Sequence, residues 1–215
     1  ATTAGWSPVA VPHAWNAGDD SDTSFMGGVG WYRKDFRLPS GSRRFSWTIR
    51  FESVNYRARI YLNGRLVGQN RGAYLPFEIR LPSRVIKRDG TNRLVVRVDS
   101  RRFATDFPPA GLSTTGTPLG GWWNYGGILR EVYLRRIDGV DFSTVAVQPD
   151  LPCGTCAATL TYRATLRNAD TRARRVSVRA RLGGRTISLG RAVVGPRKFA
   201  TLVRRVRVSN PRLWS

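Results

Sequence analysis

The chain has 215 residues, 41% hydrophobic and 11% aromatic, which is enough to bury the core of one large or two small domains. This composition argues against wholesale disorder, and no apolar run approaches the roughly 20 residues of a membrane-spanning helix. The net charge of +22 makes binding to a polyanion such as a nucleic acid the first function to consider.

The positive charge is spread along the chain. Arginine outnumbers lysine 33 to 3, and arginines such as Arg57 and Arg59 alternate with apolar residues. In a half-buried strand such positions belong to the outward face. We therefore expect a solvated, arginine-rich surface and no specific nucleic-acid site. The alternative, a polyanion site, requires one contiguous arginine face and steep salt dependence.

Alternation of apolar and polar residues predicts β-strands through nearly the whole chain. No segment has the pattern of a three-turn helix, and residues 83–87 are expected to form one short turn at most. Antiparallel strands with one buried face and Gly or Pro between them are typical of sandwiches. The predicted fold class is therefore all-β, with strands near residues 45–51, 56–62, 77–81, 94–98, 160–166, 176–182 and 199–208.

A domain boundary is expected at residues 137–139. The sequence before it is rich in aromatic residues, whereas the sequence after it is rich in Val, Arg and Ala. We predict a larger sandwich over residues 1–138 and a smaller one over residues 139–215.

Four sequence blocks carry the most information. Residues 54–81 predict a hairpin, because Asn63-Gly64 separates two alternating strands. Residues 120–134, GGWWNYGGILREVYL, read as an aromatic, glycine-rich loop that leads into a strand. The other two blocks are PHAWN at 12–16 and GWYRKDFRLP at 30–39. In this order the blocks resemble the N-terminal sugar-binding domain of glycoside hydrolase family 2, over roughly residues 6–138.

The resemblance implies a jelly-roll, galactose-binding-like β-sandwich, followed by an immunoglobulin-like β-sandwich. In the family this pair precedes a (β/α)₈ catalytic barrel. The sequence NPRLWS at 210–215 is similar to the late region of the family's second domain. The resemblance therefore implies that the second sandwich is incomplete here and that the catalytic barrel is missing from this chain.

Retaining glycoside hydrolysis needs two carboxyl groups about 5 Å apart, and the resemblance implies that both are glutamates on the barrel. This chain has three glutamates, and strand parity directs Glu52 and Glu78 to solvent. We expect no catalytic residue in this chain. No cofactor is expected either, because the glycines at 120–121 and 126–127 do not open a helix that would cradle a phosphate.

The candidate substrate-binding residues are Trp122, Trp123, Asn124 and Tyr125. Indole faces stack on the apolar face of a pyranose, and amide and hydroxyl groups bind its hydroxyls. The alternative is that this loop only plugs the end of the sandwich. Asn124 and Tyr125 match the motif of β-glucuronidase-like members, but Gly121 stands where the family has an Asp that contacts the sugar. This difference removes a charge-assisted hydrogen bond.

Two further groups of residues are candidate sites. Asp19, Asp20 and Asp22 form an acidic cluster within residues 17–28 that suits Ca²⁺, but a solvated, mobile loop is the preferred interpretation. Cys153 and Cys156 form either a local disulfide or two idle thiols. His13 is the only histidine, so we expect no metal site. The cysteine pair leans weakly towards an extracytoplasmic location.

The leading hypothesis is the non-catalytic N-terminal region of a family 2 exo-β-glycosidase, which buttresses the barrel and supplies one wall of its sugar pocket. The expected partners are a β-glycoside, the barrel of the same polypeptide and, as an open possibility, a second copy of the chain. No membrane partner is expected. The alternative is a free-standing carbohydrate-binding module.

Overall fold

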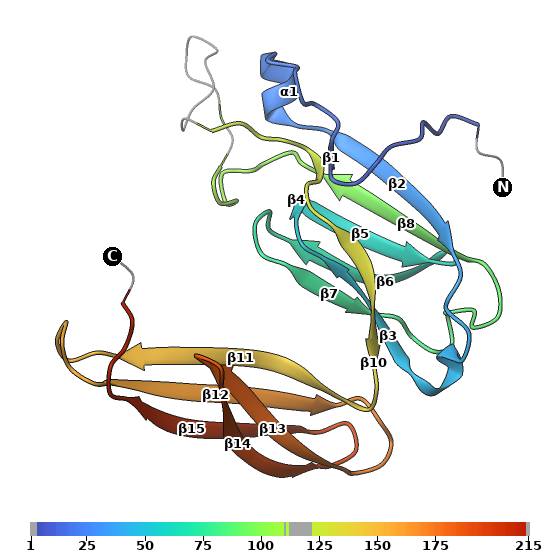
Figure 1. Cartoon of the computed structure of the whole chain (residues 1–215). Helices are drawn as coiled ribbons and strands as arrows, with labels where there is room; N and C mark the ends of the chain where they lie inside the picture. The colour runs from blue at the N-terminus through green and yellow to red at the C-terminus, as the bar shows by residue number, and fades with distance from the viewer. Residues whose placement is uncertain (1–3, 110, 112–121, 214–215) are drawn as a thin grey trace. The chain divides into compact units, whose positions relative to one another are not determined.

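The computed structural model describes residues 4–109, 111 and 122–213, and the chain divides into two compact units, residues 1–136 and 137–215 (Figure 1). The predicted first domain ends at residue 138, two residues after the end of the first unit at Arg136. Gly120, Gly121, Trp214 and Ser215, which the sequence analysis used, lie outside the described residues.

The first unit contains two larger antiparallel sheets and one small sheet. The four-stranded sheet has the order β2-β8-β5-β6, with bounds Val29–Phe36, Asn92–Asp99, Arg57–Leu62 and Arg65–Arg71. The three-stranded sheet has the order β10-β3-β7, with bounds Val132–Ile137, Ser46–Phe51 and Phe77–Arg80. The small sheet has the order β1-β9-β4, with bounds His13–Ala14, Gly127–Ile128 and Val54–Asn55.

The core of this unit lies between the two larger sheets. Strands β3, β5 and β8 alternate as predicted, and their inward residues are almost completely buried. Phe51 of β3 stacks on Phe77 of β7, with ring centroids 4.9 Å apart and planes 10° apart. Each such side chain contributes about 1.5–3 kcal/mol when fully buried. The inward residues are Trp47, Ile49, Phe51, Ala58, Ile60, Leu62, Leu94, Val96 and Val98.

The second unit is a smaller pair of antiparallel sheets. One sheet has the order β11-β12-β15, with bounds Val140–Asp150, Ala158–Asn168 and Phe199–Val208. The other pairs β13 with β14, Arg174–Leu182 with Arg185–Val194. Tyr162 and Leu166 of β12 pack in one core with Val178 of β13 and Val194 of β14. The all-β prediction is confirmed.

The structure differs from the expectation of a solvated loop over residues 17–28. Asp22–Met26 form the helix α1, whose N-cap Ser21 accepts a hydrogen bond of 3.2 Å from the Ser24 N–H. Phe25 of this helix is fully buried. Five residues are too few for a helical period, so only the cap at Ser21 signalled the helix. Within the described ranges, no group of three acidic, His or Cys side chains is placed to hold a metal.

Three smaller features complete the description. A 3₁₀ turn covers Ser42–Arg44, and the Ile86 N–H bonds to the Pro82 carbonyl at 3.0 Å to close the turn expected near 83–87. Cys153 and Cys156 form a disulfide in the connection between β11 and β12. In the part of the chain that the structure describes, no helix is long and apolar enough to cross a membrane.

Candidate functional site: the aromatic loop and its support

Asn124 lies at the centre of the aromatic loop and is fully buried. Its side-chain nitrogen donates hydrogen bonds of 2.9 Å to the carbonyls of Phe25 and Ser100. Its side-chain oxygen accepts a bond of 2.9 Å from Asn55 Nδ2. Both ends of the amide are therefore occupied by the protein itself, and Asn124 anchors the loop rather than offering an amide to a ligand.

Asn16 supplies a second anchor from the other side of the loop. Its side-chain nitrogen donates to the Asn124 carbonyl at 3.1 Å and to the Ser24 carbonyl at 3.2 Å. Its side-chain oxygen accepts from the Gly126 N–H at 2.8 Å. Asn16 is buried, so these bonds form without competition from water. The loop is thus fastened to α1 and to the N-terminal segment.

The aromatic side chains of the loop pack on the short helix. The rings of Trp122 and Trp123 lie 5.6 and 5.4 Å from the ring of Phe25, centroid to centroid. Both indoles are half-buried, whereas Tyr125 is 46% exposed. The buried indole N–H of Trp122 has no partner among the described residues. Tyr125 and the free parts of the two indoles are therefore the surface that a ligand can reach.

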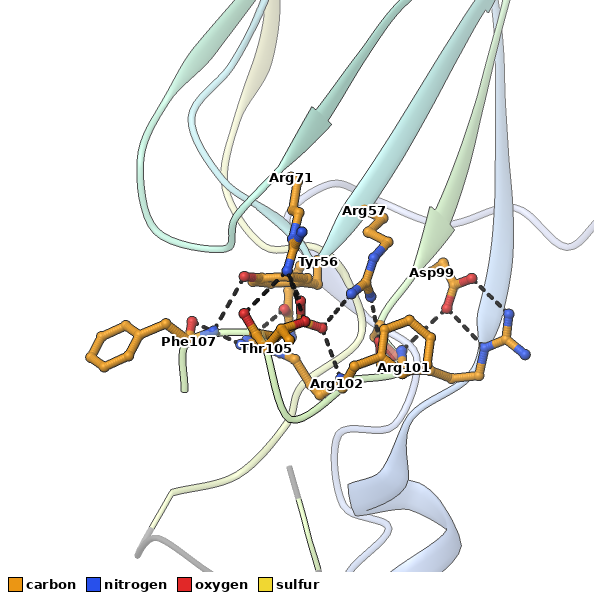
Figure 2. A network of polar contacts seen from close by, with 12 residues as sticks. Tyr56, Arg57, Arg71, Asp99, Arg101, Arg102, Thr105 and Phe107 are labelled. Carbon is orange, nitrogen blue, oxygen red and sulfur yellow. Dashed lines mark hydrogen bonds and ion pairs between the residues drawn. The ribbon is translucent and has the colours of Figure 1, made fainter. Parts of the chain in front are cut away.

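Arg102 contacts the aromatic loop through Trp122, and Figure 2 shows Arg102 in a network of polar contacts together with Tyr56 and Arg57. It is buried, and its guanidinium carbon lies 4.0 Å from the ring centroid of Tyr56 and 4.9 Å from that of Trp122. Its Nη2 donates to Asn55 Oδ1 at 2.8 Å. Burial lowers the pKa of Arg102. The ring faces and the oxygen acceptors stabilise the positive charge of its guanidinium.

Asp106 holds in place the segment around residues 103–106, which follows strand β8. Its carboxylate is buried and accepts bonds from Arg57, from Arg71 Nη2 at 2.6 Å and from the Phe103 N–H at 2.9 Å. Burial acts to raise the pKa of Asp106, but the Phe103 N–H and the two guanidiniums outweigh it, so the pKa lies below its ordinary value. Asp106 is therefore ionised throughout the physiological range.

Several large apolar side chains are exposed on residues 103–107 and on residues 74–75 between β6 and β7. The exposed fractions are 59% for Phe103, 83% for Phe107, 63% for Tyr74 and 79% for Leu75. Arg57 lies 4.5 Å over the Phe103 ring, and the Phe107 N–H donates to the Tyr56 hydroxyl at 3.3 Å. Exposed apolar groups on a fixed backbone are typical of an interaction surface.

Glu52, directly after strand β3, and Glu78 of strand β7 are not arranged as a catalytic pair. Glu52 accepts from Arg50 Nε and from the Tyr133 hydroxyl, each at 2.6 Å, and Glu78 binds Arg135 at 2.7 Å. Arg50 lowers the pKa of Glu52, and Arg135 lowers that of Glu78. A general acid needs a raised pKa, so neither carboxyl suits that role. Both side chains are 24% exposed and lie in an ion-pair network rather than free in solvent.

Sequence reasoning missed most of the support of the loop. Asn16 and Asn55 lie inside two of the quoted blocks, PHAWN and 54–81, and a polar residue in such a block was the one available signal. Phe25, Arg102 and Asp106 lie outside the predicted strands. No periodic pattern marks them, because their environment comes from distant segments.

A family model describes this fold and loop together: "Glycosyl hydrolases family 2, sugar binding domain" matches residues 7–137. The chain belongs to glycoside hydrolase family 2. A β-galactosidase of Thermoanaerobacter pseudethanolicus is 33% identical over 117 residues, 54% of this chain and 15% of that protein. A β-glucuronidase of Formosa agariphila is 32% identical over 146 residues, 62% of this chain and 14% of that protein.

A solved β-glucuronidase structure shares the fold along nearly the whole chain. The Bacteroides uniformis β-glucuronidase superposes with a TM-score of 0.76 over 98% of this chain and 25% of that one, at 22% identity. The family 2 chain described here therefore spans about a seventh to a quarter of the length of these relatives. It contains the sugar-binding domain of family 2 glycosyl hydrolases at residues 7–137.

Proposed function

We propose that this chain is the non-catalytic N-terminal region of an exo-acting β-glycosidase, and that Trp123 and Tyr125 form one wall of its sugar pocket. The observation that carries the proposal is the buried support of the aromatic loop by Asn16, Asn55 and Asn124. A loop held by so many internal hydrogen bonds presents its rings without further ordering. Such preorganisation lowers the entropic cost of binding a sugar.

The catalytic step belongs to the (β/α)₈ barrel of the longer polypeptide. Two findings support this division of labour. Glu52 and Glu78 have lowered pKa values and guanidinium partners, which suits structural ion pairs. The matched relatives are named as β-galactosidases and β-glucuronidases and are several times longer than this chain. The exposed apolar residues Phe103 and Phe107 provide a surface on which the barrel packs.

The proposal is tested with chromogenic β-galactosides and β-glucuronides. The isolated chain is expected to release no chromophore, whereas the full polypeptide encoded by the gene cleaves one of them. In that polypeptide Tyr125→Ala raises KM about tenfold, which corresponds to about 1.4 kcal/mol of lost sugar contact. Phe142→Ala, which removes a half-exposed ring from the second unit, serves as the control and leaves KM unchanged.

Two results would contradict the proposal. Hydrolysis by the isolated chain would place the catalytic pair within it. An unchanged KM in the Tyr125 and Trp123 variants would remove the loop from the sugar pocket. Micromolar binding of free galactose or glucuronate by the isolated chain, lost in Tyr125→Ala, would instead support a free-standing carbohydrate-binding module.

A further inference from the structure

The outer face of the four-stranded sheet carries an ordered set of side chains that the aromatic loop does not include. The core side of this sheet is formed by residues such as Ile60 and Val96, so the alternate positions face outward. The strand register places two rows of these outward residues side by side. The first row is Trp31, Arg97, Arg59 and Gln69, and the second is Arg33, Val95, Tyr61 and Leu66.

Two aromatic rings form a platform across these rows. Trp31 of β2 stacks on Tyr61 of β5, with centroids 6.3 Å apart and planes 30° apart. The rings come from strands on either side of β8, where Trp31 lies opposite Arg97 and Tyr61 opposite Val95, so the stacked pair spans this strand. Trp31 is 52% exposed and Leu66 of the edge strand is 54% exposed. A stacked, half-exposed indole on rigid strands is an apolar surface available for contact.

One of the three arginines in these two rows has no carboxylate partner among the described residues. Arg97 binds Asp99 at 3.2 Å, and Arg33 binds Asp35 at 2.9 Å. Arg59 is exposed and forms no ion pair with any residue that the structure describes. Its strand neighbours are Arg97 on one side and Gln69 on the other. One free guanidinium therefore stands beside an aromatic pair and a neutral amide.

We propose that this face, the Trp31–Tyr61 platform, binds an acidic oligosaccharide. The indole and phenol rings stack on a pyranose, the Arg59 guanidinium pairs with a uronate carboxylate, and the Gln69 amide binds a hydroxyl. A nucleic acid is the less suitable occupant, because a phosphate backbone needs a line of free cations and two of the three arginines here are already paired. The proposal goes beyond the pocket-wall function and does not depend on it.

The test is isothermal titration of the 215-residue chain with trigalacturonic acid, and with cellotriose as the neutral comparison. We expect the acidic sugar to bind at least tenfold more tightly than the neutral one. Arg59→Gln weakens the acidic sugar about tenfold, and Trp31→Ala abolishes binding. Arg181→Gln makes the same change of charge at an exposed site of the second unit and leaves the affinity unchanged.

Several outcomes would overturn the proposal. The first is that the wild-type chain does not bind trigalacturonic acid. The second is that the Arg59 and Arg181 variants lose equal affinity for it, and the third is that the Trp31 variant binds it as tightly as the wild type. Tighter binding of an eight-residue oligothymidylate with the same dependence on Trp31 would identify a nucleic-acid surface instead. Arg59 points to solvent, so its variant keeps the test valid even if Trp31→Ala does not fold. The Tyr125 variants report on the pocket wall, so the two proposals fail separately.

Discussion

The side-chain amide of Asn55 donates a hydrogen bond of 2.9 Å to the side-chain oxygen of Asn124, which lies 69 residues further along the chain. Asn55 in turn accepts a bond of 2.8 Å from Arg102. A continuous line of hydrogen bonds therefore runs from a buried guanidinium to the centre of the aromatic loop. The conformation of Trp122–Tyr125 depends on residues from three separate parts of the sequence.

Replacing Asn124 is expected to destabilise the first unit. Asn124→Ala leaves the buried carbonyls of Phe25 and Ser100 and one N–H of Asn55 without their partner, at a cost of about 3 kcal/mol. The measurement is the free energy of unfolding in urea. Gln69→Ala, which removes an exposed amide on strand β6, is the control and changes that free energy by less than about 0.5 kcal/mol. Equal effects of the two substitutions would show that the buried bonds of Asn124 contribute little.

The lowered pKa of Asp106 predicts how the free energy of unfolding depends on pH. Its folded-state pKa lies below its ordinary value of 3.8, so its ion pairs stabilise the fold fully above about pH 4. As the pH falls through the folded-state pKa, the carboxylate is protonated in the folded state too and this contribution is lost. Asp106→Asn lowers the free energy of unfolding by about 2 kcal/mol at pH 7 and flattens its fall below pH 4.

The measurement is urea unfolding of both proteins between pH 2 and 7. Asp89→Asn is the control, because Asp89 pairs with Arg43 while both side chains are largely exposed. That variant is expected to follow the wild-type pH profile. An Asp106→Asn profile parallel to the wild type over the whole range would show that Asp106 does not contribute to the acid sensitivity.

We expect Arg102 to be essential for the folding of residues 101–109. Arg102→Met keeps much of the length of the side chain but removes the bonds to the Phe107 and Pro108 carbonyls and to Asn55. We expect a loss of about 3 kcal/mol in the free energy of unfolding and faster proteolysis within residues 101–109. Arg101→Met is the control, since the Arg101 side chain is half-exposed and pairs with Asp99 alone among the residues that the structure describes. Proteolysis at the control rate would contradict the role of Arg102.

Gly127 permits a close approach that no other residue allows. Its φ is +147°, and an added Cβ would lie 2.1 Å from the His13 carbonyl oxygen, so Gly127→Ala is expected to cost more than about 3 kcal/mol. Gly72 has a similar φ of +128° with open space around it. Gly72→Ala therefore shares the backbone strain without the clash. Thermal unfolding of the two variants separates the cost of backbone strain from the cost of the clash. Equal melting temperatures would contradict the steric argument.

Much of the fold was predictable because it depends on local patterns. The alternation in Arg57–Leu62 and the Asn63-Gly64 pair predicted the hairpin of β5 and β6, and both turn residues have positive φ, 50° and 83°. The alternation in β3 and β8 predicted which residues face the core. Helix α1 was not predicted, since its five residues leave room for a cap and no period.

The amino-acid sequence by itself determined the strands, the hairpin turn and the position of the aromatic loop, because period-2 burial and turn chemistry act between near neighbours. Only the tertiary structure decided which groups of that loop are free. Asn124 became an anchor because Phe25, Asn55 and Ser100 converge on it from distant segments. Burial and hydrogen bonding between such segments have no local pattern, so they appear only once the sheets have packed.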